Sequence, residues 1–442
     1  MLLLGNGTLL TLGTDCRVIR GGAVLVDGST IARIGDTEEL KNTFPRASFI
    51  DCRNKLVMPG FTSVHTHSYS AFARGISLKE EPPVSFPQVL KKLWWRLDQA
   101  LTPEDIYYSA LVTFIGSIKN GTTTLLDHHA SPNAISGSLE QIAHAAGETG
   151  IRVNLCYEVS DRDGPERMNN GLSENIAFIN KCTHENSPMI TATIGMHASF
   201  TISPETMEKC ALAARELGTG IHIHVAESKE DAADCRKKYG MGVVERLDKY
   251  DLLGPKTLAA HCVHISEKEM DLLARTGTNV AHNPQSNMNN AVGCAPVVKM
   301  LDKGVLIGMG TDGMTNDMFE GMKIAHILHK HCQGDPRIGW IEVPRMQFVN
   351  NSRILSNFFA PKLGELTPGA AADIIAINYD PPTPLTADNY YGHLVFGVSG
   401  SMVDTTIAAG KILMHNRIMT GIDELKVNRT ARKLAEKLWQ RF

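Results

Sequence analysis

Two histidines in the run Val64-His65-Thr66-His67 have the spacing of a metal-ligand pair. They follow an apolar run that begins at Phe61, which we predict to be a β-strand. Because side chains alternate along a strand, His65 and His67 would point to the same side. Two imidazoles at one strand end can bind a transition metal. The same spacing also occurs in structural roles, so the pair needs support from the rest of the chain.

Further ionisable side chains lie at the ends of other predicted strands. We predict His224 as a third imidazole ligand and Asp312 as a carboxylate ligand that also accepts a proton from the attacking water. Glu227, three residues after His224, would move protons between water, substrate and leaving group. His261 would contact the water or polarise the substrate. His222 shares the face of His224 but lies deeper, so we interpret it as a packed histidine behind the ligands.

Each of these residues has a structural alternative, since a buried His is often a hydrogen-bonded core residue and a strand-end Asp often caps a helix. The clusters nevertheless all fall at carboxyl ends of predicted parallel strands, where the active sites of barrels lie. The nitrogen and oxygen ligands suit Zn2+ first, then Fe2+ or Mn2+. The fourth predicted strand ends at His197 without a lysine that could bridge two ions. We therefore expect one divalent metal, Zn2+ before Fe2+.

The elements that would hold these residues are eight short apolar runs that alternate with amphipathic stretches. This alternation predicts an α/β fold, a closed (β/α)8 TIM barrel over residues 58–361. The predicted strands cover 61–65, 123–127, 152–157, 193–197, 220–225, 258–261, 279–282 and 305–310. Short strands also occupy both chain ends, and neither end can bury a sheet alone. We predict that residues 1–57 and 362–442 pair into a small β-sandwich domain with a C-terminal helix.

Composition narrows the possible partners and the compartment. The 442 residues carry a formal net charge of −3 without a Lys/Arg cluster, which argues against nucleic acid or an anionic membrane surface as a partner. The nine cysteines include no C-x-x-C pair, as expected for reduced thiols in a cytoplasmic protein. Since no signal peptide and no apolar run of about 18 residues is visible, we expect no membrane-spanning helix.

These motifs resemble the deaminase branch of the amidohydrolase superfamily over nearly the whole chain. The resemblance rests on Pro-Gly-Phe-x-x-x-His-x-His from residue 59, His-x-x-Glu from 224, Ala-His-Cys from 260 and Gly-Thr-Asp-Gly from 310, and on the closing run 366–374. It implies that His65, His67, His224 and Asp312 bind the metal and that Glu227 shuttles protons. It also implies that His261 acts at the metal and that His197 faces the substrate.

Local runs such as 93–98 and 127–132 resemble one subgroup of that branch, aminohydrolases associated with purine catabolism and similar to chlorohydrolases and guanine deaminases. Deaminases of adenosine-like compounds usually have Lys where this chain has Asn289, which argues against a nucleoside substrate. The run that contains His128 and His129 is closer to deaminases of oxidised purines and hydroxylated triazines. His129 could donate to a ring oxygen, and His128 would then point away.

An aromatic and cationic group after the first predicted strand could bind a planar, oxygen-bearing ring. Trp95 would stack on such a ring, and Arg96 would donate hydrogen bonds to its oxygens. The alternative is a helix with one indole in the core and the guanidinium in solvent. Glu158 and Arg162 follow the third predicted strand and could also reach the pocket.

The expected function is hydrolytic deamination of a small, planar nitrogen heterocycle of the purine, oxidised purine, pyrimidine or triazine class. Two alternatives stay open from the sequence. The same site could open a cyclic amide such as a xanthine- or hydantoin-like ring, or the barrel could bind metal without catalysis. Family habit further suggests a homodimer.

Overall fold

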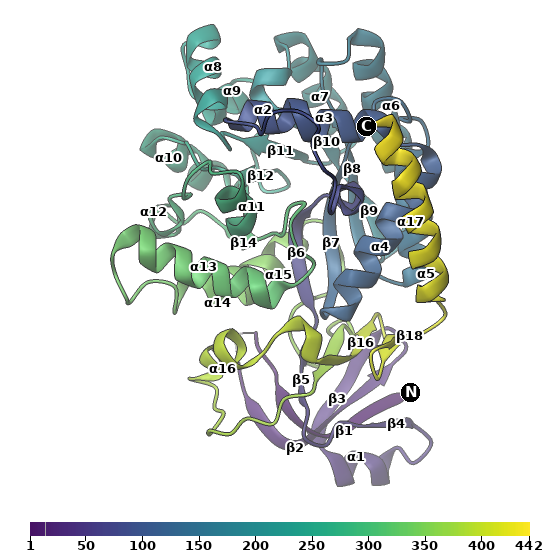
Figure 1. Ribbon diagram of the computed structural model, residues 1–442. Helices are drawn as coiled ribbons and strands as arrows, with labels where there is room; N and C mark the ends of the chain where they lie inside the picture. The colour runs from purple at the N-terminus through teal and green to yellow at the C-terminus, as the bar shows by residue number, and fades with distance from the viewer. Residues whose placement is uncertain (14) are drawn as a thin grey trace.

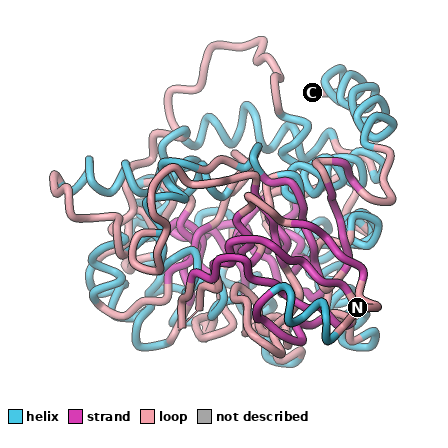
Figure 2. The backbone as a smooth tube through the Cα atoms, turned by 90° about the horizontal axis from the view of Figure 1, so that it is seen from below, coloured by secondary structure: helices cyan, strands magenta, loops and turns pink. Residues whose placement is uncertain are grey.

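The largest part of the protein is a barrel of parallel strands, shown by a computed structural model that describes residues 1–13 and 15–442 (Figure 1). Within these residues the barrel strands follow the order β6-β7-β8-β10-β11-β12-β13-β14, and the short β9 pairs with β8. A parallel bridge between Thr66 and Asp312 joins β6 to the segment after β14 and closes the ring. Figure 2 shows the strands enclosed by helices and loops. The predicted (β/α)8 barrel is confirmed.

The barrel strands lie close to the predicted ranges. They are β6 (Phe61–Thr66), β7 (Thr122–His129), β8 (Arg152–Val159), β9 (Ile190–Ala192), β10 (Ile194–Ala198), β11 (Ile221–Val225), β12 (Leu258–His261), β13 (Asn279–His282) and β14 (Ile307–Met309). All except β9 are buried over their whole length. Parallel strands covered on both faces form continuous apolar runs, which is why the sequence located them.

Helices cover the outside of the barrel. The longer ones are α4 (Pro103–Lys119), α5 (Ser138–Thr149), α6 (Pro165–Glu185), α7 (Pro204–Glu216), α8 (Lys229–Tyr239), α10 (Glu267–Thr276) and α13 (Met318–Gln333). Shorter helices are α9 (Val243–Lys249), α11 (Pro284–Asn289), α12 (Val297–Asp302), α14 (Glu342–Pro344) and α15 (Asn351–Leu355), with single turns at Ser199–Thr201 and Arg345–Asn350. Side-chain caps set several starts. Thr102 and Asp105 form a capping box at α4, for example.

The segment between β6 and α4 forms the roof of the pocket described below, and we call residues 68–100 the roof segment. It consists of a 3-10 turn (Ser68–Ala73), α2 (Phe86–Val89), a π-helical turn (Leu90–Trp94) and α3 (Trp95–Ala100). In Figure 1, α2 and α3 lie at the opposite end of the molecule from the second sheet.

The two chain ends form this second sheet, as predicted. From the N-terminal side come β1 (Leu2–Leu10), β2 (Val18–Asp27), β3 (Thr30–Asp36), β4 (Ser48–Asp51) and β5 (Leu56–Pro59); from the C-terminal side come β15 (Ile374–Ile377), β16 (Val403–Ala408), β17 (Lys411–His415) and β18 (Ile418–Met419). Antiparallel pairing of β5 with β15 joins the two ends directly. The described strands make one continuous nine-stranded sheet. Helices α1 (Thr37–Thr43) and α16 (Tyr390–Gly397) and a turn at Gly400–Met402 complete this part.

The terminal helix α17 (Glu424–Arg441) packs along α4 of the barrel rather than on the sheet (Figure 1). The indole N–H of Trp439 donates to the carbonyl oxygen of Phe72 at 2.8 Å, and Arg441 Nε donates to that of Ala100 at 3.1 Å. Both acceptors belong to the roof segment, so the chain end holds the segment near its two ends.

Candidate metal centre and substrate pocket

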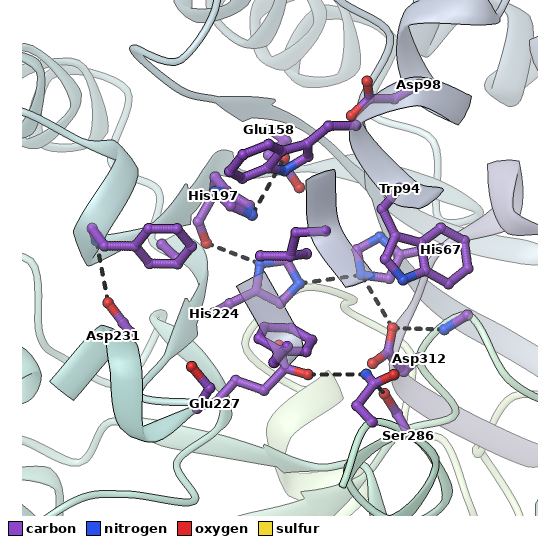
Figure 3. A pocket seen from close by; sticks show the side chains of 18 of the residues that line it. His67, Trp94, Asp98, Glu158, His197, His224, Glu227, Asp231, Ser286 and Asp312 are labelled. Atoms are coloured by element: carbon purple, nitrogen blue, oxygen red, sulfur yellow. Dashed lines mark hydrogen bonds and ion pairs between the residues drawn. The ribbon is translucent and has the colours of Figure 1, made fainter. Parts of the chain in front are cut away.

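The predicted metal ligands converge from separate barrel strands. His65 and His67 lie at the end of β6, His224 lies in β11, and Asp312 follows β14. The Nε2 atoms of His67 and His224 are 3.1 Å apart, and Asp312 Oδ1 lies 3.3 Å from His67 Nε2 (Figure 3). The same carboxylate oxygen lies 3.9 Å from His65 Nε2. The nitrogens of the three histidines lie within 4.8 Å of one another.

The two closest imidazoles turn unprotonated nitrogens toward each other. His67 Nδ1 lies 2.6 Å from the carbonyl oxygen of His128, and His224 Nδ1 lies 2.9 Å from that of His197, so both Nδ1 atoms carry the proton. Burial lowers the pKa of both rings, which keeps them neutral. The facing lone pairs repel each other unless a cation lies between them. Zinc–nitrogen distances of about 2.0–2.1 Å suit this spacing, so the residues fit a divalent metal.

His222 supports the third nitrogen of the cluster. His65 Nε2 is buried and, as far as residues 1–13 and 15–442 show, has no hydrogen-bond partner. On its other side, His65 Nδ1 lies 2.8 Å from His222 Nε2. This contact orients the ring so that Nε2 faces the cluster, as the position of His222 deeper in its strand predicts.

Replacing His222 by Phe should weaken metal binding about 10- to 100-fold, because the His65 ring would lose the contact that orients it. The measurement is competition of the apoprotein with a chromophoric zinc chelator, with circular dichroism as the check on folding. His144→Phe is the matched control, since its side chain is 63% exposed. Equal affinity of His222→Phe and the wild type would rule out the supporting role.

Glu227 and His261 lie beside Asp312 and could handle protons. His261 Nε2 lies 3.7 Å from Glu227 Oε2 and 3.6 Å from Asp312 Oδ2. Burial raises the pKa of Glu227 to about 7, against the opposing effects of His261 and of the Asn290 amide, which donates at 3.3 Å. Burial also acts to raise the pKa of Asp312, but His67 and His261 lower it overall. The two carboxyl groups thus have opposite protonation preferences, which acid–base catalysis requires.

Two of these residues lie on strained backbone. His261 has φ 75° and Asp312 has φ 52°, both in the left-handed region although neither is glycine. Such residues cost about 1–3 kcal/mol each and gather at functional sites. The sequence around His261 and Asp312 does not indicate this backbone conformation.

A cavity lies between the cluster and the roof segment. Trp95 and His197, two of the four predicted substrate contacts, line it, and burial lowers the pKa of His197 to about 4. Other aromatic rings on the wall are those of Tyr69, Phe86, Trp94 and Phe200. A planar ring that enters this cavity would therefore meet aromatic faces on the roof side and ionisable groups on the barrel side.

Arg96, the third predicted contact, is not among the lining residues. Its guanidinium pairs with Glu80 at 3.1 Å and lies over the ring of Phe442 at 4.4 Å from the centroid. The expectation for Arg96 is therefore corrected. Arg162, which pairs with Asp98, is the guanidinium near the pocket, 5.3 Å from the centroid of the Trp95 ring.

His129, the fourth predicted contact, points away from the cavity. Its Nε2 atom contacts Ser131 Oγ at 2.9 Å, and its side chain is fully buried. The structure reverses the expected orientations, because the inward-pointing side chain of β7 is that of His128, whose ring centroid lies 4.7 Å from that of His224. The contact with the Ser131 hydroxyl holds the His129 side chain outside the barrel interior.

Several lining residues were missed from the sequence. Asp98 and Tyr69 line the cavity from the roof segment, and Ser286 and Asn290 line it from the region of α11. Glu158, which the sequence analysis gave only as a residue that could reach the pocket, lines the cavity from β8. Asp98 was detectable as the one acidic residue of α3, whereas Tyr69 carries no such signal.

A barrel with a cluster of histidines and aspartate at its strand ends defines a class of metal-dependent hydrolases. The model of the amidohydrolase family matches residues 56–413, and the model of the bacterial imidazolonepropionase-like composite domain matches residues 22–47. The chain therefore belongs to the amidohydrolase family and is a hydrolase that acts on carbon–nitrogen bonds.

Curated relatives extend the match over the whole chain. It is 34% identical to a 5'-deoxyadenosine deaminase of Methanosarcina mazei, over 99% of this chain and 98% of that relative. It is 33% identical to a 5-methylthioadenosine/S-adenosylhomocysteine deaminase of Desulforudis audaxviator, over 94% of this chain and 95% of that relative. None of the helices in the described residues has the length and apolar character needed to cross a membrane.

Solved structures share the fold at lower identity. An adenosine deaminase of Xanthomonas campestris with bound zinc superposes with a TM-score of 0.88 at 21% identity, covering 99% of this chain and 98% of that one. An atrazine chlorohydrolase of Arthrobacter aurescens complexed with zinc superposes with a TM-score of 0.84 at 22% identity, covering 98% of this chain and 100% of that one. The guanine deaminase of E. coli superposes with a TM-score of 0.80 at 22% identity, covering 94% of this chain and 100% of that one.

Proposed function

We propose that this protein is an aminohydrolase that depends on one divalent metal, best matched by Zn2+, and releases ammonia from a planar nitrogen heterocycle. The observation that carries the proposal is the position of Glu227, a carboxyl group with a pKa of about 7, beside a metal-ligand cluster in an aromatic-walled cavity. Held by His65, His67, His224 and Asp312, the metal would supply a hydroxide nucleophile from water at neutral pH.

The chain's own side chains divide the proton transfers. Asp312, whose pKa is low, accepts the proton of the attacking water. Glu227 gives its proton to the ring nitrogen beside the attacked carbon. The proton that Asp312 took from the water then passes to the amino group before the carbon–nitrogen bond breaks, and the proton of the new hydroxyl returns to Glu227 as the carbonyl forms. His261 contacts the oxygen that gains charge at that carbon. Water adds, ammonia leaves and a ring carbonyl remains, so the atoms balance.

The names of the relatives support this class of substrate. The curated relatives are named for purine nucleosides, and the structural neighbours include deaminases of adenosine and guanine. The neighbours with bound zinc support Zn2+. The sequence argument against a nucleoside rested on Asn289, but that side chain is exposed, and Asn290 is the neighbour that contacts Glu227. Nucleosides therefore stay in the proposed class beside free bases.

The test is release of ammonia by the purified protein, after its metal content has been measured. The panel consists of adenosine, 5'-deoxyadenosine, guanine, 8-oxoguanine, cytosine and a hydroxylated triazine, followed with a coupled ammonia assay and mass spectrometry of products. We expect ammonia from at least one compound, loss of that activity after chelation, and its return with added Zn2+.

Two outcomes would contradict the proposal. A ring-opened product without ammonia would favour the cyclic amidohydrolase alternative. A folded, metal-loaded sample that changes no compound on a wider panel of heterocycles would favour a barrel that binds metal without catalysis.

A further inference from the structure

Helix α17 reaches the roof of the pocket from outside the barrel. Its apolar positions are three and four residues apart, so they share one face of the helix. That buried face consists of Val427, Ala431, Leu434 and Leu438. Near the start of the helix, Glu424 pairs with Lys119 of α4 at 2.8 Å. Figure 1 shows α17 running along the barrel from the second sheet to the level of α3. The helix is thus fixed to the barrel, and its last turn lies beside the roof segment.

The residues after the apolar face of α17 contact both ends of the roof segment. At the start of the segment, the indole N–H of Trp439 donates to the carbonyl oxygen of Phe72 at 2.8 Å. At its end, Arg441 Nε donates to the carbonyl oxygen of Ala100 at 3.1 Å. We call residues 439–442 the roof clasp. Because the two contacts bracket the roof segment, the clasp can define where the segment lies.

Two further contacts tie the roof clasp to the same region. The guanidinium of Arg96 donates to the carbonyl oxygen of Phe442 and lies over its ring, 4.4 Å from the centroid. Arg441 also pairs with Asp105 in the first turn of α4, so one guanidinium joins the end of the roof segment to the helix that follows it. These contacts lie outside the cavity, since no residue of the clasp is among its lining residues.

The middle of the roof segment depends on the clasp for its hydrogen bonds to the rest of the protein. Residues 71–97 carry four of the side chains that line the cavity, those of Phe86, Leu90, Trp94 and Trp95. Among the residues that the structure describes, the hydrogen bonds that leave residues 71–97 are those that join Trp439 to Phe72 and Arg96 to Phe442. Packing alone would otherwise hold these aromatic side chains over the cavity.

The position of the roof matters because its inner side lies next to the proposed metal centre. A Cβ atom added to Gly313, the neighbour of Asp312, would lie 3.6 Å from the Trp94 ring. On the other side of the cavity, the ring centroids of Trp95 and His197 are 6.1 Å apart. A small outward movement of residues 71–97 would therefore widen the space in which a planar ring has to make contact with aromatic faces.

We propose that Trp439 and Arg441 are positioning residues that hold the pocket roof over the metal-ligand cluster, so that affinity for a planar substrate depends on a helix that does not touch it. The inference rests on the proposed function for its substrate, whereas the position of the roof depends on no reaction. Loosening the clasp moves the aromatic wall and leaves Glu227 and the metal ligands in place. Substrate binding should therefore weaken while the chemical step is kept.

The first experiment measures KM and kcat by ammonia release, with adenosine and guanine as probes. Trp439→Phe keeps an aromatic ring but removes the N–H donor, and Arg441→Gln removes the guanidinium. We expect each variant to raise KM about 3- to 10-fold, the usual contribution of one hydrogen bond, and the double variant to raise it about 10- to 100-fold. We expect kcat to stay within about twofold and bound metal to stay unchanged, a split that general destabilisation would not produce.

The second experiment follows hydrogen–deuterium exchange of the backbone amides and needs no substrate. In the double variant, exchange within residues 71–97 should be at least about tenfold faster, while β11 and β12 exchange as in the wild type. Trp340→Phe and Arg432→Gln are the matched controls. Trp340 is 44% exposed, against 36% for Trp439, and Arg432 is exposed on the same helix as Arg441. Both controls should match the wild type in exchange and in KM.

The outcomes separate this inference from the proposed function. If neither compound releases ammonia, its Kd for the metal-loaded protein replaces KM. If neither compound binds the wild type, the proposed substrate class is wrong for both probes, and faster exchange of residues 71–97 alone still supports the clasp. Unchanged exchange in the double variant would overturn the inference. Faster exchange with unchanged KM or Kd, or loss of kcat or metal at unchanged KM, would also overturn it, by giving α17 only a general structural role.

Discussion

The Glu227→Gln variant is expected to keep its metal and to lose about 10²- to 10⁴-fold in kcat, the usual contribution of a general acid or base. Gln fills the same space and can still contact His261, 3.7 Å away, but it cannot deliver a proton to the ring nitrogen or the leaving group. Ammonia release is measured at saturating substrate, and bound metal is measured by elemental analysis of the same sample.

Glu216→Gln provides the control for this variant, because Glu216 is exposed at the end of α7. It should match the wild type in both measurements. A Glu227→Gln protein that turns over at the wild-type rate would remove the central proton carrier from the mechanism. Loss of metal together with activity would place Glu227 in the metal centre instead.

Replacing His67 by Ala should reduce bound metal from about one ion per chain to a small fraction and lower turnover by at least about 10³-fold. His67 Nε2 lies 3.1 Å from His224 Nε2 and 3.3 Å from Asp312 Oδ1, so its loss removes the middle of the proposed ligand set. Ligands that bind only the folded state stabilise it, by about 2.7 kcal/mol at a hundredfold excess over Kd. Added Zn2+ should therefore raise the Tm of the wild-type apoprotein and leave that of the variant almost unchanged.

His184→Asn is the matched control, because His184 is an exposed histidine on α6, outside the cluster. It should bind metal and respond to Zn2+ as the wild type does. A His67→Ala protein that still holds one tightly bound ion would mean that the centre uses another set, such as the group of His65, His261 and Asp312. Zinc titration monitored by Tm and by elemental analysis separates these results.

The barrel was predictable because its strands are buried on both faces. Runs such as Leu258–His261 and Asn279–His282 are short, apolar and separated by amphipathic helices, a pattern that few folds produce. The positions of His65, His67, His224 and Asp312 followed from the same pattern, since each lies at or just beyond the end of such a run. Their roles as ligands stay a prediction, which the geometry of the cluster supports.

The same burial on both faces hid the orientation of His128 and His129. All eight residues of β7 are buried, so hydropathy does not show which side chains of the strand point into the barrel. Only the packed barrel turns His128 toward the carbonyl oxygens of Met196 and His222 and leaves His129 outside. For Arg96, the preceding π-helical turn at Leu90–Trp94 shifts the helical register by a residue, which a regular helical pattern does not anticipate.

By itself, the sequence determined the order of the strands, the ends at which ionisable residues gather, and the chemical character of those residues. Local periodicity and composition encode these features, since each depends on neighbours along the chain. The tertiary structure alone decided which lone pairs face each other, and that Glu158 and Asp98 line the same cavity. It also decided that Phe442 holds Arg96 away from the cavity. These features depend on contacts between residues far apart in the chain, whose distances and directions appear only when the ring of strands closes.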